Sequence, residues 1–190
     1  MTQKRSHPLS RGEILDAALR IVDAEGADAL SMRRLARELG VEAMSLYHHF
    51  ESKEAILAGI IDLALQAEAP PAPIDGGSWR DPVVAAVLGF RRVLVKHPNV
   101  LPVMAAHPPT APGSAGYVEG PLRYLLGIGM SEADSTDLFQ GVFAMAFGHA
   151  MLSTSYGSIE LPGAPVVSFT EESFARTLDV LLRGYEPPAR

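Results

Sequence analysis

The sequence has no cysteine, which excludes disulfide bonds, thiol nucleophiles and thiolate-bound zinc. It also lacks any run of about 18 consecutive apolar residues, the length that a membrane-spanning helix needs. The opening residues MTQKRSH contain no apolar stretch of the kind found in a secretory signal. We therefore expect a cytoplasmic protein without membrane contact, and any metal site would have to consist of histidine and carboxylate side chains.

Basic residues are also few. The chain carries 16 Lys and Arg against 22 Asp and Glu, a net charge of −6, which argues against a nonspecific nucleic-acid binder but describes no single face. Residues 1–55 hold 8 basic and 9 acidic residues, and residues 56–190 hold 8 and 13, so the acidity lies mainly in the second part. With 190 residues and 47% hydrophobic composition, the chain is long enough for one large or two small domains with a substantial core.

Short helices are predicted at the start of the chain. The stretch from Ser10 to Glu13 indicates a capping box, in which the two side chains satisfy the first backbone N–H groups of a helix. Ser31 is a second N-cap candidate, and Gly26 and Gly40 are expected to end helices in a left-handed conformation. The predicted helices cover residues 10–25, 31–39, 42–49 and 52–67.

The remainder of the chain keeps a helical spacing of apolar residues. Further helices are predicted over residues 78–97, 99–106, 116–127 and 131–156, with a last one capped by Thr170. The stretches 69–77 and 107–116 are rich in Pro and Gly and are expected to connect packed parts. No convincing strand is found, and PVVSF at 165–169 comes nearest. The predicted fold class is therefore all-α.

Two helices joined by a glycine turn, behind a first helix, are typical of a helix-turn-helix unit, whose last helix enters the major groove of DNA. On a helical wheel, Leu46 and Phe50 define the inward side of the third helix. The residues left on its outward face and flanks are Met44, Ser45, Tyr47, His48 and His49.

The segment Tyr47-His48-His49 admits several interpretations. Adjacent histidines on a helix point about 100° apart, so they cannot chelate one ion as an i, i+4 pair can. Catalysis would need a nucleophile and an orienting carboxylate, and nothing nearby forms such a set. An ordinary solvated helix surface with a packed tyrosine remains an alternative to DNA contact. We expect no metal and no cofactor here.

Residues 10–57 resemble the DNA-binding domain of the tetracycline-repressor (TetR) family. The resemblance is carried by ILDAALRIVDAEGADALSMRRLARELGVEAMSLYHHFESKEAIL, and above all by GVEAMSLYHHFESKEAIL at 40–57. It implies a three-helix DNA-binding domain over residues 1–55 and a helical effector-binding and dimerisation domain over residues 56–190, with helix 52–67 linking the two. Residues 56–190 resemble the family's second domain only in size and helical organisation, and they contain no motif of comparable strength.

The resemblance also implies roles for individual residues of the DNA-binding domain. Ser31 and Arg33 match positions that touch DNA, and the arginine sometimes reads guanine. Positions that bind backbone phosphate are matched by Ser45, Tyr47, His49 and Lys53. The variable reading positions are Glu42, Ala43, Met44 and His48, of which Glu42 could accept from cytosine while Ala43 or Met44 could touch a thymine methyl.

This chain departs from the expected pattern in one respect: its third helix has no Lys or Arg. Attraction to phosphate is then expected from Arg33, Arg34, Arg37, Lys53, the helix N-termini and the Lys4-Arg5 arm. For Arg34 and Arg37, an ordinary exposed charged face is an equal alternative.

Helix 131–156 has two unlike faces. Small residues fall on one side and the phenylalanines 139, 143 and 147 on another. The resemblance implies that this helix and the last one pack against their copies in a homodimer, with an interface that includes Gly141, Ala144, Gly148, Phe174, Leu178 and Leu181. The alternative is that both helices are only core. A dimer is favoured because one recognition helix makes few contacts, and two-fold pairing calls for a pseudo-palindromic double-stranded operator.

An effector cavity is a further expectation. Its apolar lining would come from Phe90, Met104, Tyr117, Tyr124, Phe143 and Phe147, and its polar groups from Arg91, His107 and His149. Aromatic residues at helical spacing are more often plain core, and a lone histidine is more often structural.

Taken with the resemblance, these patterns predict a transcriptional regulator, a repressor that leaves its operator when a small, largely apolar effector binds. No HExxH, GxSxG or glycine-rich phosphate loop is present, so no enzyme is predicted. A scaffold protein with a decorative helical head is the other alternative, and sequence-specific DNA binding would separate it from a regulator.

Overall fold

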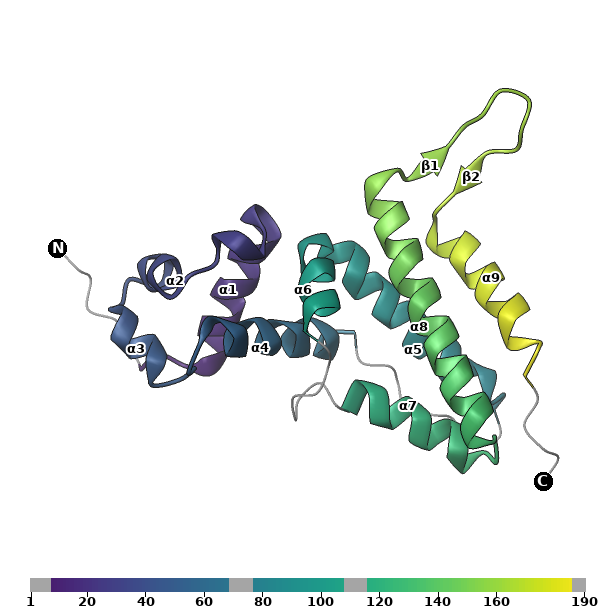
Figure 1. Ribbon diagram of the computed structural model, residues 1–190, viewed down its shortest axis with the longest axis horizontal. Helices are drawn as coiled ribbons and strands as arrows, with labels where there is room; N and C mark the ends of the chain where they lie inside the picture. Colours follow the sequence, from purple (N-terminus) through teal and green to yellow (C-terminus); the bar gives the residue numbers. More distant parts are fainter. Residues whose placement is uncertain (1–7, 69–76, 108–115, 186–190) are drawn as a thin grey trace. The chain divides into compact units, whose positions relative to one another are not determined.

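The computed structural model describes residues 8–68, 77–107 and 116–185 (Figure 1). Its helices are α1 (Arg11–Glu25), α2 (Met32–Leu39), α3 (Ala43–Tyr47), α4 (Lys53–Gln66), α5 (Arg80–Lys96), α6 (Leu101–Ala106), α7 (Gly116–Gly127), α8 (Glu132–Ser155) and α9 (Glu171–Leu182). Single 3-10 turns span Ala27–Ala29 and Pro98–Val100, and two short strands, β1 (Ser158–Ile159) and β2 (Val167–Ser168), pair antiparallel. The all-α prediction is confirmed.

The chain forms two compact units. The described part of the first runs to Gln66 and also takes in residues 99–107, and that of the second comprises residues 67–68, 77–98 and 116–185. The first unit thus contains α4 and α6 in addition to the three-helix head. The functional division at residue 55 stays a prediction. The predicted Lys4-Arg5 arm lies outside the described residues, as do 69–76 and 108–115 of the two predicted connectors.

The core of the first unit is built on the contact between α1 and α4. The capping box starts α1 as predicted, with Glu13 N–H donating to Ser10 Oγ (3.2 Å) and Ser10 N–H donating to Glu13 Oε2 (2.9 Å). The buried faces of the two helices then meet. They pack tightly at Gly59, where a Cβ atom would lie 2.6 Å from Leu15 Cδ2. The buried side chains include Ile14, Ala18, Ile21, Val22, Ile56 and Ile60.

The second unit is organised around α5 and α8, which lie side by side, with α7 and α9 packed against them. Tyr124 Oη on α7 donates to the Trp79 carbonyl (3.0 Å), which fixes α7 against the start of α5. Within α5, a Cβ atom at Gly89 would lie 2.7 Å from the Glu68 carbonyl oxygen, so any larger residue there would force the backbone to shift. The core side chains are Val87, Leu125, Met130, Leu138, Val142, Ala146, Phe174, Leu178 and Leu182.

The structure differs from the sequence-based expectation in three places. The third helix is shorter than predicted, Ala43–Tyr47 in place of 42–49, because the His49 N–H bonds back to Leu46 in a tightened turn. Gly26 ends α1 with φ 83° and ψ 167°, an extended geometry that differs from the left-handed one of Gly40 (φ 67°, ψ 32°). A short hairpin occupies residues 158–168, where no convincing strand was predicted, since each strand has only two residues.

Candidate nucleic-acid interface and effector site

The turn between α2 and α3 determines which side chains α3 presents. Gly40 adopts the left-handed conformation, and the Val41 N–H closes the end of α2 on the Ala36 carbonyl (3.0 Å). Ser31 caps the start of α2, accepting from the Arg34 N–H at 3.1 Å. Glu42 is the N-cap residue of α3 and makes no side-chain cap bond, so its carboxylate is left exposed to solvent.

The two sides of α3 differ sharply in burial. Leu46 is fully buried and Phe50 is 3% exposed, while Met44 and Tyr47 are 65% and 47% exposed. The inward and outward sides predicted from the helical wheel are therefore confirmed, and the alternative of a packed tyrosine fails. Among the predicted DNA-binding residues, the exposed ones are Ser31, Arg33, Glu42, Met44, Tyr47 and His48, and the half-buried ones are Ala43, Ser45, His49 and Lys53.

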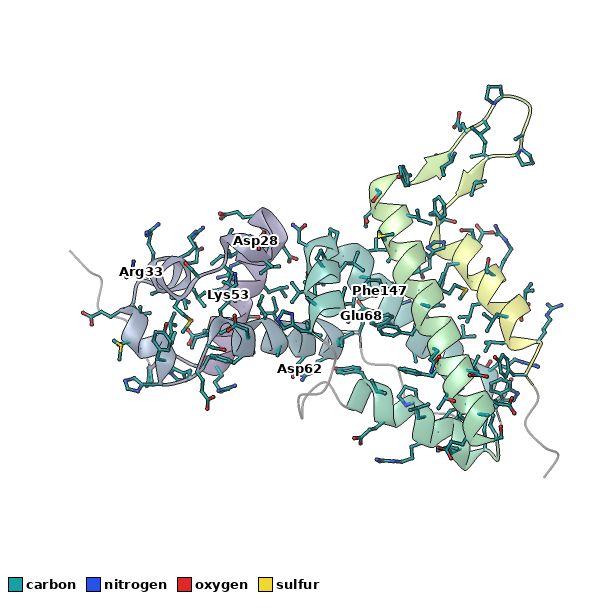
Figure 2. All side chains as sticks on the ribbon, in the orientation of Figure 1. Asp28, Arg33, Lys53, Asp62, Glu68 and Phe147 are labelled. Atoms are coloured by element: carbon teal, nitrogen blue, oxygen red, sulfur yellow. The ribbon has the colours of Figure 1, made fainter. Side chains whose placement is uncertain are left out.

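The arginines of α2 are not equivalent. Arg34 binds Glu25 (2.9 Å) and Glu38 (2.7 Å), and hydrogen bonds to Glu38 and then Glu25 raise the pKa of its guanidinium. Its charge is compensated locally. Within the described part of the chain, by contrast, Arg33 and Arg37 show no ion pair. Figure 2 shows Arg33 on α2 and Lys53 at the start of α4.

Arg11 was not predicted from the sequence as a functional residue, but it links the start of α1 to the residues that follow α3. Its guanidinium donates to the His49 carbonyl and lies 4.0 Å from the centroid of the Phe50 ring. It therefore holds the end of α3 against the start of α1. No sequence signal could have identified this contact, because the partners lie 38 positions apart in the chain.

The predicted aromatic lining of the second unit forms a ladder along α8. The Phe143 ring lies 5.0 Å from the Phe90 ring, 5.9 Å from that of Phe139 and 6.0 Å from that of Phe147, all in stacked geometry. These four rings are half-buried, as are Tyr117 and Tyr124 on α7. Phe139 was not among the predicted lining residues, although its spacing of four from Phe143 was visible in the sequence.

Met104 and His107 belong to the first unit instead. Met104 is half-buried on α6, and His107 follows that helix as its C-cap residue. The His107 Nδ1 atom lies 3.0 Å from the Val103 carbonyl oxygen of the same helix. This ring is therefore already engaged with backbone, as expected of a structural histidine.

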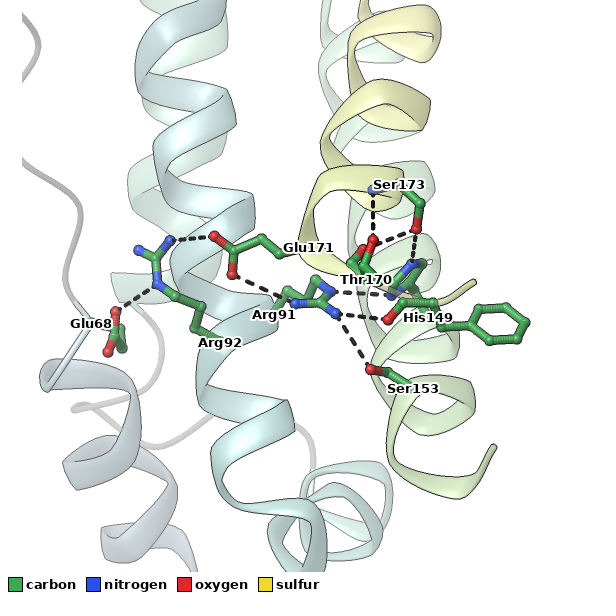
Figure 3. Close-up of polar contacts among 9 residues, drawn as sticks. Glu68, Arg91, Arg92, His149, Ser153, Thr170, Glu171 and Ser173 are labelled. Atoms are coloured by element: carbon green, nitrogen blue, oxygen red, sulfur yellow. Dashed lines mark hydrogen bonds and ion pairs between the residues drawn. The ribbon is translucent and has the colours of Figure 1, made fainter. Parts of the chain in front are cut away.

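Arg91 and His149 form the centre of a polar cluster in the second unit (Figure 3). Arg91 is 4% exposed, and its Nε donates to His149 Nδ1 (3.1 Å). Its terminal nitrogens lie 3.2 Å from the Phe169 carbonyl oxygen, 3.5 Å from Ser153 Oγ and 3.6 Å from Glu171 Oε2. The guanidinium thus bridges α5, α8 and the start of α9.

The protonation of this cluster follows from its geometry. Arginine has no acceptor, so His149 Nδ1 must accept and the ring proton must sit on Nε2, 3.5 Å from Ser173 Oγ. Burial, followed by the Arg91 charge, lowers the pKa of His149. Burial also lowers the pKa of Arg91, against the opposing effect of Glu171. A neutral histidine beside a buried arginine results.

The predicted dimer residues fall into two sets. A Cβ atom at Gly141 or Gly148 would meet nothing within 4 Å, and Ala144 is exposed, so this stripe of α8 is open. Phe174 and Leu178 are fully buried among residues of their own chain, and Leu181 is half-buried. The exposed apolar side chains near these positions are instead Met151 on α8 and Val180 on α9.

Two features are absent from the described residues 8–68, 77–107 and 116–185. No three His, Asp or Glu side chains among them are grouped so that they could hold a metal ion. Nor does any helix in this part of the chain combine the length and apolar character needed to cross a membrane.

Two family models match this chain. Residues 14–60 match the model of bacterial regulatory proteins of the tetR family, and residues 71–157 match that of the tetracyclin repressor-like C-terminal domain. An HTH-type transcriptional regulator from Saccharopolyspora erythraea is 35% identical over 136 residues, which cover 70% of this chain and 56% of that protein. An HTH-type transcriptional repressor from Streptomyces coeruleorubidus is 31% identical over 126 residues, which cover 66% of this chain and 47% of the repressor. The chain spans about half the length of these two curated relatives.

A solved structure is similar over nearly its whole length. The crystal structure of a TetR protein from Acinetobacter baumannii in complex with minocycline matches with a TM-score of 0.72 and 27% identity. The match covers 93% of this chain and 96% of that one.

Proposed function

The chain belongs to the TetR family of bacterial regulatory proteins, and from that premise we propose that it is a DNA-binding transcriptional repressor that acts as a homodimer on a pseudo-palindromic operator. The observation that carries this proposal is the surface of α3, where Met44 and Tyr47 face solvent over the buried Leu46 and Phe50. A large apolar and an aromatic side chain held outward on a short helix behind a glycine turn suit a major groove.

The residues of this surface divide by task. Tyr47, Ser45, His49 and Lys53 bind phosphate and fix the register, whereas Arg33, Glu42, Ala43, Met44 and His48 meet base edges. Ser52 helps to place Lys53, because Ser52 Oγ accepts from the Ala55 N–H (3.2 Å) at the start of α4. Since α3 carries no basic residue, Arg33, Arg37 and Lys53 supply the attraction to phosphate.

The effector binds in the second unit. The half-buried ladder of Phe90, Phe139, Phe143 and Phe147 offers stacked ring faces to a flat, largely apolar molecule. Minocycline, the ligand of the Acinetobacter baumannii protein named above, supports an effector of this kind. Arg91 is a weaker candidate contact than the rings, because a ligand would have to displace one of its protein partners.

Effector and operator are coupled through the dimer. An effector that prefers a dimer state with wrongly spaced heads releases the protein from DNA, and by linkage the operator weakens effector binding by the same factor. The coupling follows the chain through α4, which begins at Lys53 on the DNA side. Just after α4, Glu68 accepts a hydrogen bond from Arg92 Nε (3.0 Å) in the second unit. The proposal includes no catalytic step, and it places the protein in the compartment that holds the chromosome.

A gel shift tests the proposal. The purified protein is mixed with DNA from upstream of its own gene and with scrambled DNA of equal length, over a range of salt concentrations. We expect one preferred site and a steep fall of log affinity with log salt, since each neutralised phosphate contributes a slope of about −0.9. Tyr47→Ala should weaken binding to all sequences, with the fold intact because the ring is half exposed. Equal affinity for operator and scrambled DNA at every salt concentration would favour a scaffold over a regulator.

A further inference from the structure

The segment between α8 and α9, residues 156–169, forms a hairpin that extends past the ends of both helices (Figure 1). We call it the hairpin arm. Ser158 pairs with Ser168 and Ile159 with Val167, and the Phe169 N–H donates to the Gly157 carbonyl (2.9 Å) below that ladder. A hairpin of two-residue strands is marginal by itself, so its shape has to be fixed in other ways.

The tip of the hairpin arm is shaped by its own sequence. Leu161-Pro162-Gly163-Ala164 forms a turn closed by the bond from Ala164 N–H to the Leu161 carbonyl (3.1 Å). Proline at the second position and glycine with φ 77° at the third are what a type II turn requires. The tip is therefore preorganised, which lowers the entropy lost when a partner binds.

The base of the hairpin arm is held by the polar cluster. Arg91 donates to the Phe169 carbonyl (3.2 Å), and Ser173 Oγ donates to the Ser168 carbonyl (2.7 Å). Arg91 is itself fixed by His149 on α8. The buried arginine thus anchors the arm to α5 and α8, and the tip is left projecting from a rigid base.

The hairpin arm exposes an unusual amount of apolar surface. Its exposed large side chains are Tyr156 (64%), Ile159 (37%), Leu161 (61%), Val166 (55%) and Val167 (50%). The only charged residue in the segment is Glu160. Exposed apolar side chains gathered in so short a segment indicate an interaction site, and strand edges are normally protected by more charge than the single Glu160 supplies.

We propose that the hairpin arm docks on a second copy of this chain, where it packs against the outer faces of α8 and α9. The inference rests on the proposed homodimer and adds to it a named contact. Because a two-fold interface repeats every contact, the arm of each copy contacts the other copy.

Three observations favour a second copy as the occupant. The arm is continuous with the proposed interface, since it follows directly after α8 and leads into α9, whose outer faces expose Met151 and Val180. The open stripe of Gly141, Ala144 and Gly148 permits close approach but offers little apolar area, while a stable interface buries about 1,600 Å². The arm supplies the large side chains that this stripe lacks.

The third observation concerns charge. The hairpin arm contains no Lys or Arg, so nothing in it attracts the phosphates of nucleic acid or of an anionic membrane. A single glutamate on each arm does not prevent two copies from associating.

Photo-cross-linking tests the contact directly, because a chain without cysteine accepts a single engineered one. Leu161→Cys carries a benzophenone probe at the tip of the arm, and Leu126→Cys on α7, at 46% exposure, is the matched control. Isotope-labelled and unlabelled copies are mixed before irradiation. We expect the arm probe to join labelled to unlabelled chains at α8 or α9, and the control probe to give no such product.

Sedimentation equilibrium measures the same contact by its contribution to affinity. The double variant Leu161→Ser/Val166→Ser should raise the dimer dissociation constant by at least about tenfold, with an unchanged circular dichroism spectrum because both side chains are exposed. Leu126→Ser should leave the constant unchanged.

The outcomes separate this inference from the proposed function. A parent dimer whose dissociation constant is unchanged in the double variant, with no cross-link between copies, overturns the role of the arm and leaves the regulator intact. A parent that is monomeric at every concentration overturns the homodimer and the arm together. Arm-dependent binding to phosphatidylcholine vesicles, without cross-links between copies, would assign the arm to a lipid surface instead.

Discussion

Adjacent arginines on α2 illustrate how neighbouring residues of one type take different tasks. Arg34 is held by two glutamates, one of them on α1, so it fastens α2 to its neighbour. Arg33 is exposed and shows no ion pair among the described residues, so it is available to DNA. Helical spacing alone could not separate the two, since both lie on the polar side of the helix, and only the family resemblance pointed to Arg33.

Substitution of each arginine by alanine should therefore change a different property: operator affinity for Arg33 and thermal stability for Arg34. Arg33→Ala should weaken operator binding by at least about tenfold, because one good contact to a base contributes about 1–3 kcal/mol of discrimination. Its melting temperature should stay that of the parent. Arg34→Ala should lower the melting temperature slightly and change operator affinity less than about threefold at moderate salt. Gel shifts and thermal melts measure both, and a larger loss of DNA affinity for Arg34→Ala would contradict the assignment.

His149 makes the stability of the protein depend on pH. The fold lowers the pKa of this ring below its ordinary value of 6.5, because burial and the Arg91 charge oppose protonation. Below pH 6.5 the unfolded chain takes up a proton that the folded chain resists, so the unfolded state gains stability as the pH falls. The stabilising contribution is fully present above about pH 7.

His149→Gln should therefore reduce the loss of stability between pH 7.5 and 5.5 that the parent shows. Urea unfolding at these two pH values measures the difference in free energy. His48→Gln, a histidine-to-glutamine change at an exposed position of the first unit, is the control substitution. If His149→Gln lost as much stability as the parent over this range, the ring would not be held neutral by the fold.

The starts of helices were the features of the fold that could best be predicted from the sequence. Ser10, Ser31, Ser131 and Thr170 all cap helices as expected, because a cap is decided by residues within three positions of each other. The burial of Leu46 and exposure of Tyr47 followed from helical spacing in the same way. The hairpin arm was missed, since two-residue strands leave no alternating pattern.

Contacts between distant elements were not predictable. The bonds from Arg91 to His149 and Phe169 span 58 and 78 positions in the chain. Nor could the apolar stripe of α9 reveal what it packs against: Phe174 and Leu178 were assigned to a dimer interface but are buried in their own chain. That assignment stays a prediction, and the open stripe of α8 is the stronger candidate.

Close packing of elements gives a prediction on two glycines. Gly89→Ala should lower the free energy of unfolding by about 1–3 kcal/mol, because the added Cβ lies 2.7 Å from a backbone oxygen of Glu68 that cannot rotate away. Gly59→Ala should cost less than about 1 kcal/mol. There the added atom meets only the end of the Leu15 side chain, and alanine favours the helix. Equal losses for the two variants in urea titrations would contradict this ranking.

At the scale of the whole molecule, the proposed function requires two copies of the chain to be held at a fixed separation. In that proposal one head offers a five-residue α3 to DNA, so two heads are needed for a specific site of useful affinity. The same helix, α8, carries the aromatic ladder on one side and the open stripe of small residues on another. The proposed effector on the ladder would therefore act on the proposed dimer through this single helix.

Gly148→Gln tests whether the open stripe is the dimer interface. Within one chain the new side chain meets nothing, and glutamine is a better helix former than glycine by about 0.5–1 kcal/mol, so the isolated chain should be slightly more stable. In the dimer the same side chain would stand between two closely packed backbones. The dissociation constant should therefore rise by at least about tenfold, and the melting temperature should respond less than that of the parent to dilution over an accessible range.

Gly127→Gln on α7 is the matched control, since that position is equally open but lies away from the stripe. It should keep both the dissociation constant and the dependence of melting on concentration. Because the gain in helix stability and the loss of association come from the same substitution, misfolding cannot imitate the result. A Gly148→Gln protein that sediments as the parent dimer at every concentration would place the interface elsewhere, and Met151 and Val180 would then be the next positions to substitute.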